Sequence, residues 1–169
     1  MKKTLLGLTF ATGLLAGGAA FAQTCTATSG TPLIDGPDSN TNLPAFDTCT
    51  ATDQLAVVCS GLNPIGNALD AIWQVTIGPG AHSGSFNLST SNASYDIYAG
   101  LMSGGCSGAS PCPIEADSNG NGGSETLGPI DGLANGTYFL IVTTFGAGCG
   151  PVTVGVPTTP VSLQGFSVE

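Results

Sequence analysis

The chain has 169 residues, of which 11 are acidic and only two are Lys or Arg, and its formal net charge at pH 7 is −9. Because binding to nucleic-acid phosphates needs clusters of Lys and Arg, this composition excludes a nucleic-acid partner.

Residues 1–22 have the form of a secretory signal peptide. Lys2 and Lys3 provide a positive start, residues 4–15 are apolar but too few to span a bilayer as a helix, and residues 20–22 (Ala-Phe-Ala) form a small-residue cleavage site. Cleavage removes both basic side chains and leaves 11 acidic ones against none, a formal charge of −11. We therefore expect a secreted or periplasmic product without a membrane span, whose carboxylates face solvent, accept backbone hydrogen bonds or hold a metal ion.

The next part of the chain, residues 23–54, is rich in Thr, Ser, Asn, Asp and Pro. Its prolines interrupt any long strand, so we expect an irregular N-terminal arm with one short strand near 24–27. A short apolar strand is predicted over 55–59, at the start of the folded domain.

Three runs between residues 70 and 101 alternate apolar and polar side chains, which is the pattern of half-buried β-strands. They cover 70–77, 85–90 and 94–101. We expect them to form an antiparallel meander with one buried face. Trp73 falls on the inward parity and is predicted to lie in the core, whereas Tyr98 falls on the outer parity and is predicted to be a surface contact.

The second half of the chain must supply the opposing sheet. A long loop is expected over 103–124. Residues 136–144 are apolar on both parities, as in a central strand that is covered on both faces. The other strands are predicted at 113–116, 127–133, 151–156 and 161–168.

About eight short strands and no helical periodicity after the signal segment predict an all-β fold. We expect an antiparallel, jelly-roll-like β-sandwich over 55–157, followed by a C-terminal strand or tail over 158–169.

Six cysteines follow the signal segment, and an even number in an exported chain favours disulfides. Connectivity does not follow from the sequence. The predicted pairs are Cys106–Cys112 as a local staple, Cys49–Cys59 across an N-terminal hairpin, and Cys25–Cys149 between the arm and the late strands. Zinc is the competing interpretation, which is disfavoured because the chain has no Cys-x-x-Cys and only one histidine.

Several segments together resemble the bacterial pre-peptidase C-terminal domain. They are Leu-Asp-Ala-Ile-Trp-Gln-Val-Thr-Ile (69–77), Gly-Ser-Phe-Asn-Leu-Ser (84–89), Tyr-Asp-Ile-Tyr-Ala-Gly (95–100), a cysteine-bearing loop, Asp-Ser-Asn-Gly (117–120) and Leu-Ala-Asn-Gly-Thr-Tyr-Phe-Leu-Ile-Val (133–142). The resemblance covers residues 59–156. It implies a jelly-roll-like sandwich that accompanies secreted hydrolases without catalysis of its own, and related modules on this scaffold bind collagen. No peptidase domain precedes this one, so we expect a module that stands alone.

Residues 117–122 match the first half of a calcium loop, in which oxygen ligands alternate and a glycine makes the sharp turn. The second half departs from the pattern, because Gly128 stands where a bidentate Glu is needed. A calcium site and a plain polar turn both stay open. The candidate ligands are Asp117, Asn119, Asn121 and Glu125, with Asp96 or Glu115 approaching in space.

The sequence gives no positive sign of catalysis. His82, the single histidine, lies in a Gly-Ala-His-Ser turn, and there is no Gly-x-Ser-x-Gly. Paired acids for glycoside hydrolysis would have to come from Asp70, Asp96, Asp117 and Glu125, but one Trp and three Tyr are few for sugar stacking.

We therefore predict a non-catalytic module that binds extracellular protein or carbohydrate, with Ca²⁺ as the one candidate cofactor. The alternative is a structural subunit of a bacterial surface layer or filament. In that case residues 160–169 would join the protein to another copy of itself by adding a strand.

Overall fold

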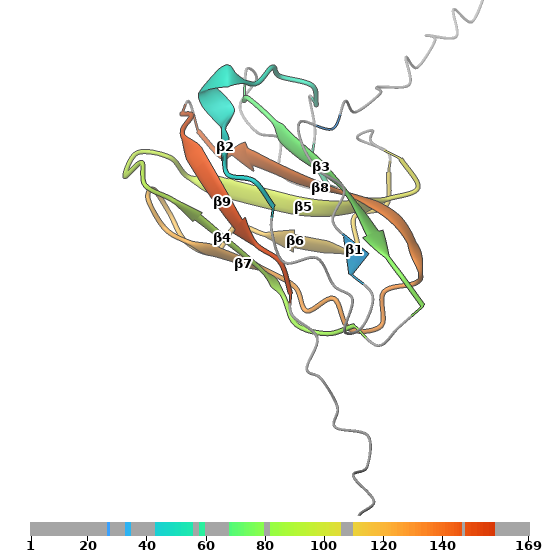
Figure 1. Ribbon diagram of the computed structural model, residues 1–169. Helices are drawn as coiled ribbons and strands as arrows, with labels where there is room; N and C mark the ends of the chain where they lie inside the picture. The colour runs from blue at the N-terminus through green and yellow to red at the C-terminus, as the bar shows by residue number, and fades with distance from the viewer. Residues whose placement is uncertain are drawn as a thin grey trace, which may run out of the picture.

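In a computed structural model of the protein, two β-sheets pack face to face (Figure 1). The structure describes residues 27, 33–34, 43–55, 58–59, 68–79, 82–105, 110–146 and 148–157. The five-stranded sheet has the order β1 (Leu33–Ile34), β3 (Ala71–Ile77), β8 (Gly136–Thr144), β5 (Ile97–Ser103) and β6 (Ile114–Ala116). The four-stranded sheet has the order β2 (Phe46–Asp47), β9 (Pro151–Gly155), β4 (Phe86–Thr90) and β7 (Glu125–Leu127).

All described strand pairs are antiparallel except β1 with β3. The one helical element in the described ranges is the 3-10 turn η2 (Thr48–Thr50), and no described helix is long and apolar enough to cross a membrane. The predicted all-β, jelly-roll-like sandwich is therefore confirmed.

The three alternating runs form β3, β4 and β5 as predicted, but the expected meander is wrong. β3 and β5 both pair with β8, which lies between them, and β4 belongs to the opposite sheet, where it pairs with β7 and β9. Alternation with period two shows which face of a strand is buried and does not name the neighbouring strand. The partner of β3 and β5 comes from much later in the chain.

The N-terminal arm contributes a two-residue edge strand to each sheet, which the sequence did not reveal. β2 pairs Phe46 with Val152, and β1 pairs Leu33 with Thr76. Two residues are too few for a periodic pattern. The strand expected near 24–27 lies outside the described residues apart from Ala27, which is not in a strand, and the one expected over 161–168 lies wholly outside them.

Two further strand predictions need correction. The strand expected over 127–133 ends at Leu127, because β7 occupies Glu125–Leu127 and a turn follows. The described residues of 55–59 form no extended strand; Leu55, Val58 and Cys59 are instead buried against the outer face of the five-stranded sheet.

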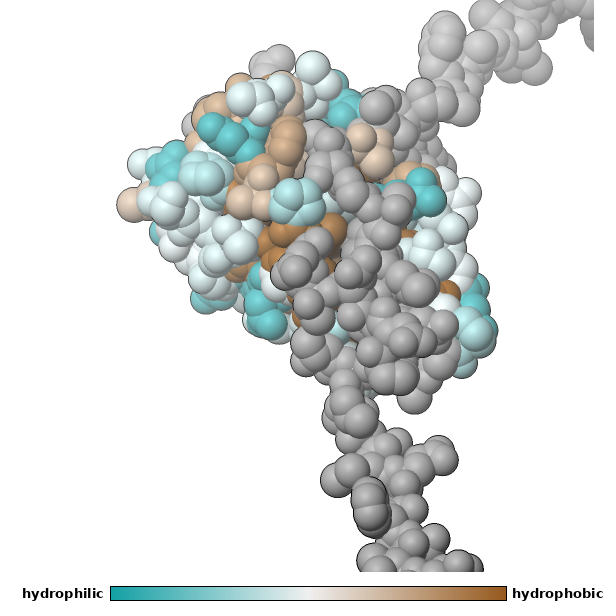
Figure 2. All heavy atoms as spheres, viewed as in Figure 1, coloured by the Kyte–Doolittle hydropathy of each residue, from teal (hydrophilic) through white to brown (hydrophobic). Residues whose placement is uncertain are grey.

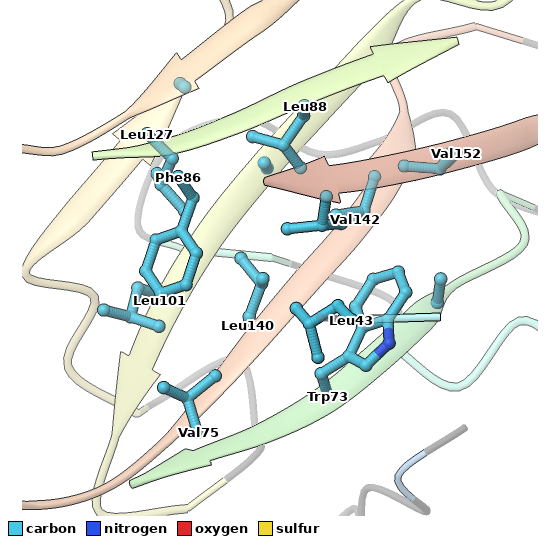
Figure 3. Close-up of a cluster of buried hydrophobic side chains, with 14 of the residues drawn as sticks. Leu43, Trp73, Val75, Phe86, Leu88, Leu101, Leu127, Leu140, Val142 and Val152 are labelled. Carbon is cyan, nitrogen blue, oxygen red and sulfur yellow. The ribbon is translucent and has the colours of Figure 1, made fainter. Parts of the chain in front are cut away.

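The main core lies between the sheets (Figure 3). Trp73 is fully buried there, as predicted, and the ring of Phe46 meets it edge-on with the ring centroids 6.4 Å apart. Burial of each large apolar side chain is worth roughly 1.5–3 kcal/mol, so this layer stabilises the pairing of the two sheets. Its other large members include Val75, Phe86, Leu88, Tyr95, Ile97, Leu101, Leu127, Leu140, Val142 and Val152.

A second apolar cluster covers the outer face of the five-stranded sheet. It joins Ile72, Tyr98, Met102 and Ile141 from the strands to Leu55, Val58 and Cys59 above them. In β8, Leu140 and Val142 therefore face the main core while Ile141 faces the second cluster. This confirms that the 136–144 strand is covered on both faces.

The two disulfides in the described part of the chain differ from the predicted ones. Cys49 bonds to Cys149 with a Cα–Cα distance of 4.9 Å, and Cys59 bonds to Cys112 with a Cα–Cα distance of 5.2 Å. The predicted pairs Cys106–Cys112, Cys49–Cys59 and Cys25–Cys149 are all wrong, because each uses a cysteine that is bonded elsewhere. Cys25 and Cys106 themselves lie outside the described residues.

The sheets explain the observed pairing. β2 runs beside β9, and Thr48 N donates to Gly150 O at 2.9 Å, which brings positions 49 and 149 together across 100 residues. Sequence proximity was the wrong guide, because the sandwich brings distant loops into contact. The disulfides indicate an oxidising compartment, extracellular or periplasmic.

Candidate functional site

Three loops meet at one end of the sandwich and are held together by hydrogen bonds to backbone carbonyls. Gly122 N donates to Tyr95 O at 2.9 Å, and Asn92 Nδ2 donates to Cys149 O at 2.7 Å. The disulfide of Cys149 adds a covalent link to η2. A site on such loops is positioned in advance by the scaffold. We call this region the loop end, and it consists of residues 91–96, 117–124 and the described part of 145–150.

Glu125 anchors the longest of these loops. Its side chain is 1% exposed, its Oε1 accepts a hydrogen bond from Asn119 N at 2.6 Å, and its Oε2 accepts one from Ser118 N at 3.0 Å. Asn119 Nδ2 also donates to Ser124 O at 2.6 Å. These charge-assisted bonds stabilise a buried carboxylate that has no cationic partner among the described residues.

Four carboxylates gather around the loop end, and we call them the acidic quartet: Asp96, Glu115, Asp117 and Glu125. The pKa of Asp117 is raised, first by burial and then by the charges of Asp96, Glu125 and Glu115. Asp96 Oδ1 is buried, and no described residue hydrogen-bonds to it. The only Lys or Arg residues in the sequence, Lys2 and Lys3, lie outside the described ranges.

The structure therefore places the predicted calcium ligands in two different environments. Asp117, Asn119 and Asn121 are exposed, whereas Glu125 is buried and uses both oxygens to hold the loop. Asp96 and Glu115 lie close enough to Asp117 for their charges to raise its pKa. Among the four acids, Asp96 alone has a buried oxygen without a hydrogen-bond partner in the described part of the chain, and oxygen is the ligand atom that Ca²⁺ prefers.

Tyr98 has the outer parity that the sequence predicted, but it is not a surface contact. It is fully buried beneath the second apolar cluster, and its hydroxyl lies 3.2 Å from both Val58 O and Glu115 Oε2. Burial, followed by the charge of Glu115, raises the pKa of Tyr98. The prediction failed because outer parity does not imply solvent when a separate segment covers the face.

The exposed aromatic side chain that the sequence placed at Tyr98 is instead that of Phe145. It is 40% exposed and is the one large hydrophobic side chain that is exposed among the described residues. Its backbone N–H donates to Asp96 O at 3.1 Å, so Phe145 lies next to the backbone of Asp96, one member of the acidic quartet. The loop end lies at the left of Figure 1, and pale or teal residues predominate there in Figure 2. Sequence reasoning missed Phe145, because it directly follows a strand that is apolar on both parities.

The groups considered for catalysis have structural contacts. The buried Oδ2 of Asp70 accepts hydrogen bonds from Gln54 N at 2.7 Å and Leu55 N at 2.8 Å. Burial raises the pKa of Asp70, and these two bonds act in the opposite direction. His82 Nε2 lies 3.1 Å from Leu133 O. Asp70 thus holds the segment that covers Tyr98.

One further group of metal-binding residue types lies beside the second apolar cluster. Sγ of Cys59, Sγ of Cys112 and a carboxylate oxygen of Glu115 all lie within 4.8 Å of one another. The two sulfurs are joined in a disulfide, so they are not thiolates and do not offer the ligands of a zinc site.

Comparison with known proteins finds no matching family model and no similar curated protein. The resemblance to the pre-peptidase C-terminal domain therefore depends on the quoted segments.

Proposed function

We propose that this protein is a secreted, non-catalytic binding module whose loop end recognises an extracellular protein or carbohydrate with the help of Ca²⁺. Residues 1–22 direct export in this proposal, which agrees with the oxidising compartment that the disulfides indicate. The proposal depends above all on one observation: the exposed Phe145 is hydrogen-bonded through its backbone to Asp96 of the acidic quartet, on loops that are fixed by hydrogen bonds and a disulfide.

Electrostatics support the calcium part of the proposal. Burial and then the charges of three neighbouring carboxylates raise the pKa of Asp117, and a mature chain without Lys or Arg offers no side chain to offset those charges. Asp96 Oδ1 is buried and has no hydrogen-bond donor among the described residues. A divalent cation held between Asp96 and Asp117 would remove the repulsion and supply the missing partner.

The contact surface supports the binding part. An aromatic ring buries a large apolar area at a small cost in side-chain entropy, which makes aromatic residues effective anchors in interfaces. Phe145 would stack on the apolar face of a sugar ring or enter a pocket of a protein, while nearby carboxylates accept hydrogen bonds. The resemblance to a non-catalytic accessory domain points in the same direction.

The metal is tested first, with Ca²⁺ alone as the probe. We expect the melting temperature of the mature protein to rise with CaCl₂ relative to chelator, because a ligand at 100 times its Kd stabilises the native state by about 2.7 kcal/mol. Asp96→Asn and Asp117→Asn should abolish the rise. The matched control is Asp131→Asn at the other end of the sandwich, which keeps an oxygen to accept the bond from Gly84 N and should respond as the wild type does. A wild-type melting temperature that is indifferent to Ca²⁺ would refute the calcium site.

Binding is tested separately on a panel of insoluble polysaccharides and of collagen, with and without Ca²⁺. We expect the mature protein to be retained by one member and Phe145→Ala to be released without a change in melting temperature. Retention that ignores Phe145→Ala would refute the loop end as the contact surface. Concentration-dependent light scattering that disappears on deletion of 160–169, without retention on the panel, would instead favour the structural-subunit alternative.

A further inference from the structure

We infer that the side chain of Asn135 is a site of spontaneous deamidation and isoaspartate formation, and that the fold protects the other two sites of the same sequence. The chain contains three Asn–Gly pairs, at 119–120, 121–122 and 135–136. In this reaction the backbone nitrogen of the glycine attacks the side-chain Cγ of the asparagine, and ammonia leaves. The resulting succinimide is opened by water at either carbonyl, which gives aspartate or isoaspartate.

The reaction needs a side chain that can turn back onto the following amide and an amide nitrogen that is free to attack. All three pairs meet the local sequence requirement, because glycine places no Cβ in the path of the ring closure. Differences in rate must therefore come from what the fold does to each pair.

The two pairs in the loop end are both restrained. Asn119 donates from its Nδ2 to Ser124 O at 2.6 Å, a bond that must break before the side chain can turn onto the next amide, and its backbone N donates to Glu125 Oε1 at 2.6 Å. For Asn121 the attacking nitrogen belongs to Gly122, which donates to Tyr95 O at 2.9 Å. A Cβ on Gly122 would come within 2.9 Å of Ala93 Cα, so this backbone has little room to move.

The side chain of Asn135 is not restrained in this way. Asn135 is exposed, lies in a bend, and its side chain makes no hydrogen bond within the described part of the chain. Gly136 is also exposed, and no atom lies within 4 Å of a Cβ placed on it, so a five-membered ring has space to form. Gly136 is the first residue of β8 and pairs with Ile77, the last residue of β3. The ends of paired strands open more readily than their middles.

The modification would matter for the fold as well as for the charge. Asparagine becomes a carboxylate, and the isoaspartate product also adds one carbon to the main chain directly before β8, the strand that pairs with both β3 and β5. Because the sequence outside residues 1–22 has no Lys or Arg, each event makes an already acidic protein more acidic.

Peptide mapping by mass spectrometry tests this inference. The folded protein is aged at mildly alkaline pH, then reduced and cut after glutamate, since trypsin has no site beyond Lys3. Cleavage after Glu115 and Glu125 separates residues 116–125, which carry the two protected pairs, from residues 126–169, which carry Asn135 alone. We expect deamidation at Asn135 to be several-fold faster than at Asn119 or Asn121.

Two controls decide whether the fold is responsible. In denaturant with reductant the three rates should become similar, because the local sequences are alike and the restraints are gone. Asn135→Gln should remove the acidic band that accumulates on isoelectric focusing of the aged protein. Equal rates in the folded protein, faster reaction at Asn119 or Asn121, or an unchanged rate ratio on unfolding would each overturn the inference.

Discussion

Gly100 offers a sharp test of how the second apolar cluster is packed. It lies in the middle of β5, between the inward-facing Ala99 and Leu101, so its own Cα faces outward beneath the Cys59–Cys112 disulfide. A Cβ added at Gly100 would overlap Sγ of Cys59 and lie 3.3 Å from Sγ of Cys112. The perturbation is the single methyl group of Gly100→Ala.

The expected cost follows from two opposing effects. Overpacking a well-filled site costs about 1–3 kcal/mol. Replacing Gly by Ala lowers the entropy of the unfolded chain, which stabilises the folded state by about 0.4–1 kcal/mol where the backbone conformation suits Ala. Gly100 meets this condition, because its φ is not in the left-handed region. The net loss in the free energy of unfolding is therefore about 1–2 kcal/mol, which corresponds to roughly 3–8 °C in melting temperature for a domain of this size.

Urea denaturation of matched variants measures this loss. Gly120→Ala is the control, because no atom lies within 4 Å of its Cβ and its φ is not positive, and it should not lower stability. The decisive comparison is Gly100→Ala in a Cys59→Ala/Cys112→Ala background, where the obstructing sulfurs are gone and the substitution should cost less than half as much. An equal cost in both backgrounds would refute the argument that the disulfide rests on Gly100.

Three further predictions concern the Cys49–Cys149 disulfide, Asp70 and Asp117. Cys49→Ala/Cys149→Ala removes a link across 100 residues and should lower the free energy of unfolding in urea by about 2–5 kcal/mol. Asp70→Ala leaves two buried backbone amides without an acceptor and should cost about 2–4 kcal/mol in the same assay, whereas Asp70→Asn, which keeps one oxygen, should cost less. The pKa of Asp117 is raised above its ordinary value of 3.8, so its contribution to stability is fully present below pH 3.8 and is lost as the pH rises through the raised value. In chelator, the melting temperature should therefore rise on acidification from pH 7 towards pH 4, and less steeply in Asp117→Asn; a wild-type protein that is most stable at pH 7 in chelator would contradict this.

The sequence was informative where a local pattern carried enough residues. The nine residues of β8 were predicted with their full bounds, because a run that is apolar on both parities is the direct consequence of burial on both faces. Trp73 was placed in the core for the same kind of reason. The gathering of Asp96 and Glu115 near Asp117 was no more than an open expectation, since these residues lie on different strands and loops.

The failures share a cause as well. Three predictions depended on which segments become neighbours: the meander, the cysteine pairs and the exposed Tyr98. Each took segments that are close in the sequence to be close in space. Cys49 instead meets Cys149 across 100 residues, and Val58 covers Tyr98 from 40 positions away. Phe145 was missed because it directly follows β8, a strand that is apolar on both parities.

The sequence by itself determined the class of the fold, the faces of the long strands and a chain without Lys or Arg beyond its first residues, because side-chain alternation and composition are local properties. Tertiary structure alone decided the sheet order, the disulfides, the anchoring role of Glu125 and the exposure of Phe145 next to Asp96. Each of these depends on contacts between segments far apart in the chain, and the free energy of such contacts exists only once the two sheets have closed on their common core.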